Sequence, residues 1–167
     1  MPALARWIPD VTPALNALIA RRAMCDVGIM ELTTNRSPVI DGYMAAAGSP
    51  LGMSWCAAAA AAWFREMGAE IPPSEAGAVI AWKQWGFRTA RWTSRPAIGR
   101  AVIYGDAQDN PEHMGVIVRV APALLSVEGN TSLAGYSTNG VGCFAKAATL
   151  ARVLGYVNPL PLNRDEM

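Results

Sequence analysis

The sequence predicts a single α+β domain in which N-terminal helices pack on an antiparallel β-sheet. Its 167 residues are about one domain's worth of chain, and a chain of this length can bury roughly two thirds of the surface that it exposes when unfolded. Helix signals fill the first half of the chain, whereas short runs of β-branched and aromatic residues fill the second half. We therefore expect residues 1–167 to form one folding unit, with helices first and strands second.

Four helices are expected in the first half, each between a start signal and a closing glycine. The start signals are a capping serine or threonine, or a proline at the first helical position. Apolar residues recur at helical spacing after each of them. The expected helices cover residues 13–26, Ser37-Pro38 to the residue before Gly48, residues 55–67 with Ser54 as cap and Gly68 as end, and about Ser74 to Trp85 with Gly86 as end and with Val79, Ile80 and Trp82 facing inward.

Five strands are expected in the second half. They are short runs rich in β-branched and aromatic residues, separated by turn residues. The expected strands cover residues 100–104, 113–120, 124–130, 142–147 and 154–157. The Ala-Pro-Ala link at 121–123 is short enough to join the second and third of these strands as an antiparallel hairpin.

Composition and charge argue against several classes of protein. The net charge is +1 without a basic run, so the stripe of cations that a nucleic-acid binder uses against phosphates is missing. The first 22 residues lack the order of charged, apolar and small residues that marks a signal peptide. No apolar run approaches the roughly 18 to 20 residues that span a bilayer. We expect neither a nucleic-acid partner nor a membrane span.

The three cysteines, Cys25, Cys56 and Cys143, include no C-x-x-C pair. This pattern argues against a disulfide framework and against a tetrahedral zinc site. Cys25 and Cys143 are either buried thiols or a disulfide pair, which would require Cα atoms within about 7 Å. One histidine with scattered thiols supplies metal ligands poorly, so no metal and no other cofactor is expected.

Cys56 is the candidate nucleophile. It follows the expected cap Ser54 by two residues, so its sulfur would lie in the first turn of a helix, where unpaired N–H groups and the helix dipole favour a thiolate. The alternative is that Cys56 is a small buried residue in an alanine-rich helix, as many thiols are. The residues around it must decide between the two.

His113, the single histidine, stands at the start of an expected strand after a polar loop. A lone histidine is often a surface loop residue, but if Cys56 is catalytic then His113 is the base, because the chain has no other imidazole. Glu128 and Asn130 lie two residues apart on the next strand and are expected to share a face. Either could orient the imidazole, although Glu128-Gly129-Asn130 could equally be a plain turn.

Three segments resemble the CHAP amidohydrolase/peptidase family of the papain-like NlpC/P60 superfamily. They are GMSWCAAAAAAWFREMG at 52–68, EHMGVIVRV at 112–120 and VEGNTS at 127–132. The resemblance covers roughly residues 28–158 and implies a papain-like fold. The segment at 96–100 departs from the family's Pro-x-x-Gly-Asp pattern, because this chain has Arg100 where the family has the aspartate.

The resemblance also implies site residues and a reaction. Cys56 would be the nucleophile, His113 the base, and Glu128 with Asn130 the orienting group in a thiol-dependent acyl transfer. The backbone N–H of Cys56 is a natural oxyanion donor, and no second donor is assigned, although Tyr43 and Ser54 are conceivable. Of the aromatic residues, only Trp55 is expected near the substrate. The expected activity is that of a peptidoglycan amidase or endopeptidase, acting on stem peptides or glycan-peptides.

An enzyme of this kind without an export signal would be made in the bacterial cytoplasm and act in the periplasm or cell wall. It would be a phage lysin, or an antibacterial effector with an immunity protein as partner. The competing class is a domain that keeps the fold for wall binding or for building a phage particle, with Cys56 retained only for packing. A metal-dependent hydrolase is the third class, and the scarcity of ligands argues against it.

Overall fold

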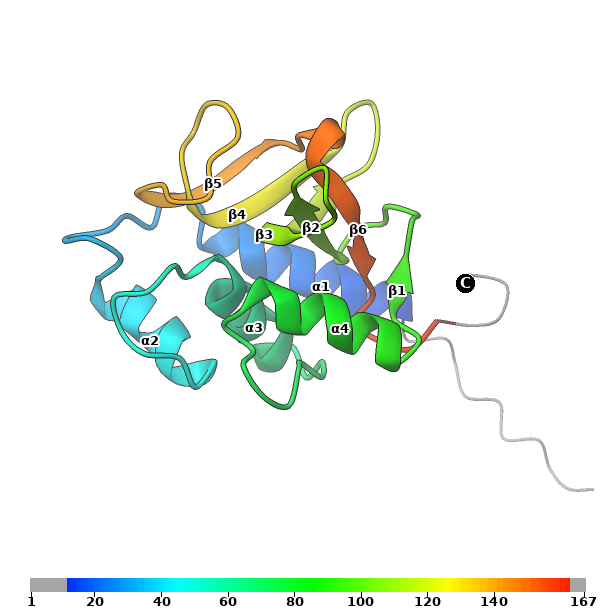
Figure 1. Ribbon diagram of the computed structural model, residues 1–167, viewed down its shortest axis with the longest axis horizontal. Helices are drawn as coiled ribbons and strands as arrows, with labels where there is room; N and C mark the ends of the chain where they lie inside the picture. Colours follow the sequence, from blue (N-terminus) through cyan, green and yellow to red (C-terminus); the bar gives the residue numbers. More distant parts are fainter. Residues whose placement is uncertain (1–11, 163–167) are drawn as a thin grey trace, which may run out of the picture.

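The computed structural model describes residues 12–162, which form four helices and a six-stranded antiparallel sheet, with three of the helices packed on one face of the sheet (Figure 1). The α+β class predicted from the sequence is confirmed. The helices are α1 (Thr12–Cys25), α2 (Pro38–Ala46), α3 (Cys56–Glu66) and α4 (Val79–Arg88). The strands are β1 (Trp92–Thr93), β2 (Ala101–Gly105), β3 (Pro111–Arg119), β4 (Leu125–Thr131), β5 (Gly142–Ala147) and β6 (Val153–Val157), with a short 3-10 helix at Leu150–Arg152.

The strand order in the sheet is β1-β6-β2-β3-β4-β5. β3 and β4 pair antiparallel across the short link at 121–123, as expected, with Val116 opposite Val127. The five expected strands all form, with ends that agree with the expected ones to within two residues. The sequence pattern gave no sign of β1, because its two residues gain strand geometry only by pairing with the far end of β6.

Local signals place α2 and the end of α3. The Ser37 side chain accepts a hydrogen bond of 3.3 Å from the Ile40 amide and so caps α2, with Pro38 at the first helical position. Gly68 follows α3 with a φ of +81°, a conformation that favours glycine. The expectation that Ser54 caps α3 is wrong, because the cap residue is Trp55 and no side chain bonds to the helix start.

α4 begins at Val79, later than the expected Ser74, because the preceding residues form turns and Glu75 has a φ of +54°. Gly86 lies inside α4 and does not end it. A Cβ atom on Gly86 would lie 3.1 Å from the Val157 side chain, so this glycine lets the helix approach β6 closely. Of the residues expected to face inward, Trp82 is fully buried, whereas Ile80 is exposed.

The main core lies between the sheet and helices α1, α3 and α4, which pack against β3. All six alanines of α3 are buried there, so over these residues the helix carries little side-chain bulk where it packs against β3 and β4. A smaller apolar cluster covers the opposite face, around Tyr104 and Tyr156, with Tyr136 from the β4–β5 loop packed on it. Among the described helices, none is both long and apolar enough to cross a bilayer.

Candidate active site

Cys56 is the first residue of α3 and lines a cleft of about 590 Å³. The cleft walls come from the segment between α2 and α3, the segment before α4, and the start of β3. Their lining residues include Ser49, Met53, Ser54, Glu75, Ile80 and Glu112. Because Cys56 stands in the first helical turn, its own N–H has no helical acceptor and is free to bind a ligand oxygen.

Two of these wall segments touch each other. A Cβ atom added to Gly77 would lie 1.9 Å from the Ser49 Oγ, so the absence of a side chain at position 77 brings the two segments into contact. Ser49 belongs to the segment between α2 and α3, and Gly77 to the segment before α4. The cleft therefore has two walls of loop structure that depend on each other for their shape.

Trp55, the residue before Cys56, is held from three sides. Its indole Nε1 donates to the Glu31 carboxylate at 3.0 Å, and its ring stacks on Tyr43 with centroids 6.1 Å apart. Gly129 of β4 leaves room for the ring, because a Cβ there would lie 2.5 Å from Trp55 Cζ3. Tertiary contacts thus fix the start of α3 in place of a side-chain cap.

These contacts decide the part that Trp55 plays. The residue is fully buried and does not line the cleft, so the structure corrects the expectation that it contacts substrate. Tyr43 is also removed as an oxyanion donor, because its hydroxyl donates to the buried carboxylate of Asp26. Ser54 lines the cleft and keeps its side chain free of the helix cap.

His113 and Glu128 form a buried pair on adjacent strands. His113 Nε2 lies 3.1 Å from Glu128 Oε2, and neither side chain exposes more than 4% of its surface. A Cβ atom on Gly115 would lie 2.6 Å from Glu128 Cγ, so the glycine two residues after the histidine makes room for the carboxylate. The spacing His-x-Gly on β3 therefore has a packing reason.

The other nitrogen of the imidazole, Nδ1, is buried and has no hydrogen-bond partner. Burial by itself lowers the pKa of His113, but the neighbouring Cys56 thiol and Glu128 outweigh it and raise this pKa from 6.5 to about 9. Cys56 is therefore an electrostatic neighbour of the ring without an ideal hydrogen bond to it. Loose contacts of this kind are common between catalytic groups before substrate binds.

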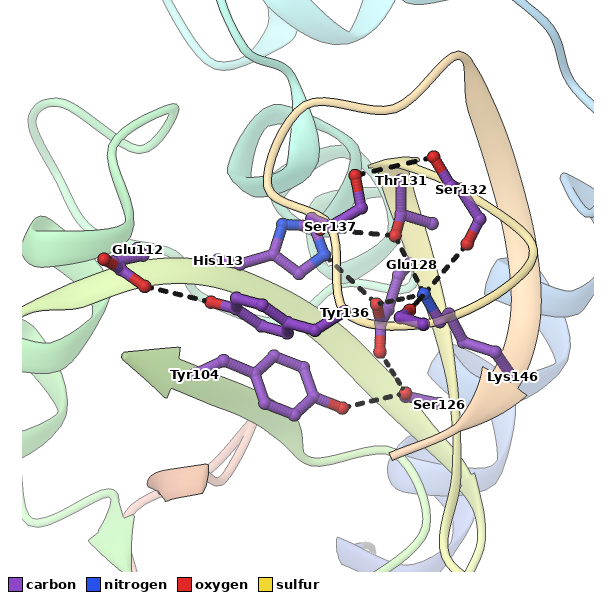
Figure 2. A network of polar contacts seen from close by, with 11 residues as sticks. Tyr104, Glu112, His113, Ser126, Glu128, Thr131, Ser132, Tyr136, Ser137 and Lys146 are labelled. Carbon is purple, nitrogen blue, oxygen red and sulfur yellow. Dashed lines mark hydrogen bonds and ion pairs between the residues drawn. The ribbon is translucent and has the colours of Figure 1, made fainter. Parts of the chain in front are cut away.

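Further polar groups surround Glu128 (Figure 2). Ser126 Oγ donates to Glu128 Oε1 at 2.6 Å, and the Tyr104 hydroxyl lies 3.0 Å from Ser126 Oγ. Lys146 Nζ lies 3.9 Å from Glu128 Oε2. Burial raises the pKa of Glu128, but hydrogen bonding and charge from His113, with Ser126 and Lys146, hold it below its ordinary value. Glu128 therefore carries a negative charge at neutral pH.

Asn130, the alternative orienting residue, does not contact His113. Its amide is hydrogen-bonded to the Asn35 amide at 2.8 Å and lies near Glu31. The expected shared face with Glu128 is lost because Asn130 has a φ of +52° and the β4–β5 register shifts after Glu128. The structure thus brings together Cys56, His113 and Glu128. Asn130 instead binds the segment between α1 and α2.

The remaining candidate ligands and thiols are dispersed. Cys25 and Cys143 are free thiols, the first exposed and the second buried, so they do not form a disulfide. Burial raises the pKa of Cys143 to about 12. Within residues 12–162, no three His, Cys, Asp or Glu side chains gather closely enough to hold a metal ion.

Sequence reasoning missed three contributors, Ser126, Lys146 and Tyr136. Ser126 stands two residues before Glu128, so strand alternation could have placed both on one face. Lys146 is the single charged residue in its strand, and nothing local indicates which side of the strand it faces. Tyr136 comes from the β4–β5 loop, and its ring packs edge-on against His113 with centroids 6.3 Å apart.

No family model, no curated protein and no solved structure matches this chain. The chemistry must therefore be argued from the geometry of the site. A thiol at a helix start lines a cleft, an imidazole neighbours it, and a buried carboxylate binds the far nitrogen of that imidazole. Such an arrangement can activate a sulfur nucleophile and supply a proton to a leaving group.

Proposed function

We propose that this protein is a cysteine amidohydrolase that cuts amide bonds in bacterial peptidoglycan. The observation that carries the proposal is a series of three groups that begins at the cleft: Cys56 lines it, His113 neighbours Cys56, and the buried carboxylate of Glu128 contacts His113. Each group has the role that its environment suits. Cys56 is the nucleophile, His113 the general base and acid, and Glu128 the residue that orients the imidazole.

The proposed reaction is an acyl transfer in two stages. His113 Nδ1 takes the proton of the Cys56 thiol, and the sulfur attacks the carbonyl carbon of the amide. The N–H of Cys56 stabilises the oxyanion that forms. His113 then protonates the leaving amine, the C–N bond breaks, and a water molecule deprotonated by His113 releases the acid and regenerates the thiol.

Glu128 supports this reaction through the tautomer of the imidazole. By accepting from Nε2–H, the carboxylate keeps the proton of a neutral imidazole on Nε2 and leaves the Nδ1 lone pair for the thiol. The same carboxylate stabilises the imidazolium that forms when the thiolate does. A buried acid at this position has no comparable use in a domain that only packs Cys56.

The choice of peptidoglycan rests on the resemblance of residues 52–68, 112–120 and 127–132 to the CHAP family within the papain-like superfamily. The cleft of about 590 Å³ agrees with it, because this volume suits a short peptide. Its walls are largely apolar or backbone, and their charged side chains are the carboxylates Glu75 and Glu112. We propose action as a phage lysin, or as a delivered effector with an immunity protein as partner.

The test is digestion of purified sacculi from several wall types with wild-type protein and Cys56→Ala. Cys25→Ala is the matched control, because it removes an exposed thiol and leaves the cleft intact. We expect fragments with new amino termini from wild type and Cys25→Ala, and none from Cys56→Ala. The masses of the fragments name the bond that is cut. A folded wild-type protein that releases nothing from any wall would refute the proposal and favour the binding class.

A further inference from the structure

Lys146 is a buried cation beside the proposed site. Its side chain is 7% exposed, and it reaches from β5 toward the carboxylate of Glu128. The amino group donates to Thr131 Oγ1 at 3.2 Å, to the Ser132 carbonyl at 2.8 Å and to the Gly135 carbonyl. These bonds use all three of its N–H groups. Figure 2 shows the amino group on one side of Glu128 and the imidazole on the other.

The positive charge itself needs an explanation. A buried lysine costs free energy unless a negative group compensates for it. A neutral donor could satisfy the hydroxyl and the two carbonyls. The carboxylate of Glu128, 3.9 Å from the amino group, is the negative group that compensates for the charge of the lysine. Lys146 in turn contributes to holding the pKa of Glu128 below its ordinary value.

The polar and titratable groups that face Glu128 come from β2, β3 and β5 and from its own strand, β4. The facing groups are His113 from β3, Tyr104 from β2, Lys146 and Cys143 from β5, and Ser126 from its own strand. Among these groups, Lys146 and the imidazole of His113 are the two that can carry a positive charge. His113 is faced in addition by Cys56 from α3 and by the rings of Tyr104 and Tyr136.

This balance affects how readily His113 releases a proton. A buried carboxylate with no other countercharge would hold the imidazolium strongly, because opposite charges attract more in a poorly solvated site. An imidazolium held in that way is a poor acid for the leaving amine and a poor acceptor for the next proton. A second cation near the same carboxylate oxygen, Glu128 Oε2, weakens this hold without changing the orientation of the ring.

We propose that Lys146 is a positioning residue that neutralises Glu128, so that this carboxylate orients the His113 imidazole without holding its proton too strongly. The inference rests on the acid–base role proposed for His113. It adds a residue that does not touch substrate and acts through Glu128. Lys146 also holds the turn that carries Tyr136 over the imidazole, through the Ser132 and Gly135 carbonyls.

The single histidine makes a direct test possible, because the imidazole proton signals in an NMR titration belong to His113 alone. Lys146→Gln removes the charge and keeps a donor for the turn, and Lys146→Met is a second neutral variant. Lys146→Arg keeps the charge. Lys83→Gln is the matched control, because Lys83 is the other lysine of the chain and pairs with the exposed Asp109 on the surface.

We expect both neutral variants to raise the titration midpoint of His113 by about one pH unit. Lys146→Arg and Lys83→Gln should leave it near the wild-type value. In a Glu128→Gln background, Lys146→Gln should no longer raise the midpoint. A midpoint that falls in Lys146→Gln would overturn the proposal, because it would show that Lys146 does not weaken the hold of Glu128 on the imidazolium. An unchanged midpoint, or a rise that persists without Glu128, would overturn it as well.

The titration needs no substrate, so its result is separate from that of the digestion of sacculi. If the midpoint rises as expected and no wall fragment is released, the role of Lys146 as countercharge stands and the proposed function fails. If fragments are released and the midpoint does not rise, the enzyme stands and the role of Lys146 is refuted.

Discussion

Replacing Gly129 with alanine will displace Trp55, the residue that precedes Cys56. The new Cβ would lie 2.5 Å from Trp55 Cζ3, 2.8 Å from Cε3 and 3.2 Å from the Ala59 side chain. Carbon atoms prefer separations of about 3.5–4.0 Å, so the ring must move by about 1 Å. It has little room, because Tyr43 stacks on it and Glu31 holds its Nε1.

Overpacking of this kind costs about 1–3 kcal/mol of folding free energy. A shift of about 1 Å at the start of α3 also misplaces Cys56, and such errors reduce catalytic rates about 100-fold. Urea unfolding measures the first effect, and the rate of Cys56 alkylation by iodoacetamide measures the second without any assumed substrate.

Gly42→Ala is the matched control for this substitution. Gly42 lies exposed in α2, and a Cβ there meets no atom within 4 Å. Alanine at a helical glycine stabilises by about 0.5–1 kcal/mol, so the two variants should shift the unfolding midpoint in opposite directions. If Gly129→Ala unfolds at the wild-type urea concentration and alkylates at the wild-type rate, the anchoring of α3 through Trp55 is refuted.

Two further predictions concern the buried pair of His113 and Glu128. Glu128→Gln removes the charge and keeps the shape, so the NMR midpoint of His113 should fall by about one to three pH units and hydrolysis should drop about 100-fold or more; an unchanged midpoint would contradict the electrostatic role of Glu128. The pKa of His113 is raised in the folded protein, so its contribution to stability is complete below pH 6.5 and is lost as the pH rises through about 9. Urea unfolding of wild type and His113→Gln between pH 6.5 and 9 should show this loss of stability in wild type only. If the stability of both proteins changes equally with pH, the predicted contribution of His113 is contradicted.

Much of the fold could be predicted because its signals are local. Ser37 and Pro38 begin α2 through a bond to an amide three residues on, and the strands are short runs with the expected residue types. The start of α3 could not be predicted in this way, because Trp55 is fixed by Glu31, which lies far from it in the sequence. α4 likewise continues past Gly86 because that residue packs against β6.

The candidate site was predictable to a similar degree. His113 could be chosen because it is the single histidine, and Cys56 because it is the one cysteine at the expected start of a helix. The structure makes the two residues neighbours. The choice between Glu128 and Asn130 could not be made, because strand alternation fails where Asn130 takes a positive φ. That conformation depends on the contacts of its amide with Asn35, which the pattern along β4 does not contain.

The contact between Gly77 and Ser49 has a consequence for redesign of the cleft. Residues 48–54 and 75–80 shape the space above Cys56, whereas His113 and Glu128 belong to the sheet. A library that varies only one of the two loops would lose most of its members to collisions at that contact. Exchanging both loops together, as one cassette, would change which ligand fits and leave the strands that carry the imidazole and its carboxylate unaltered.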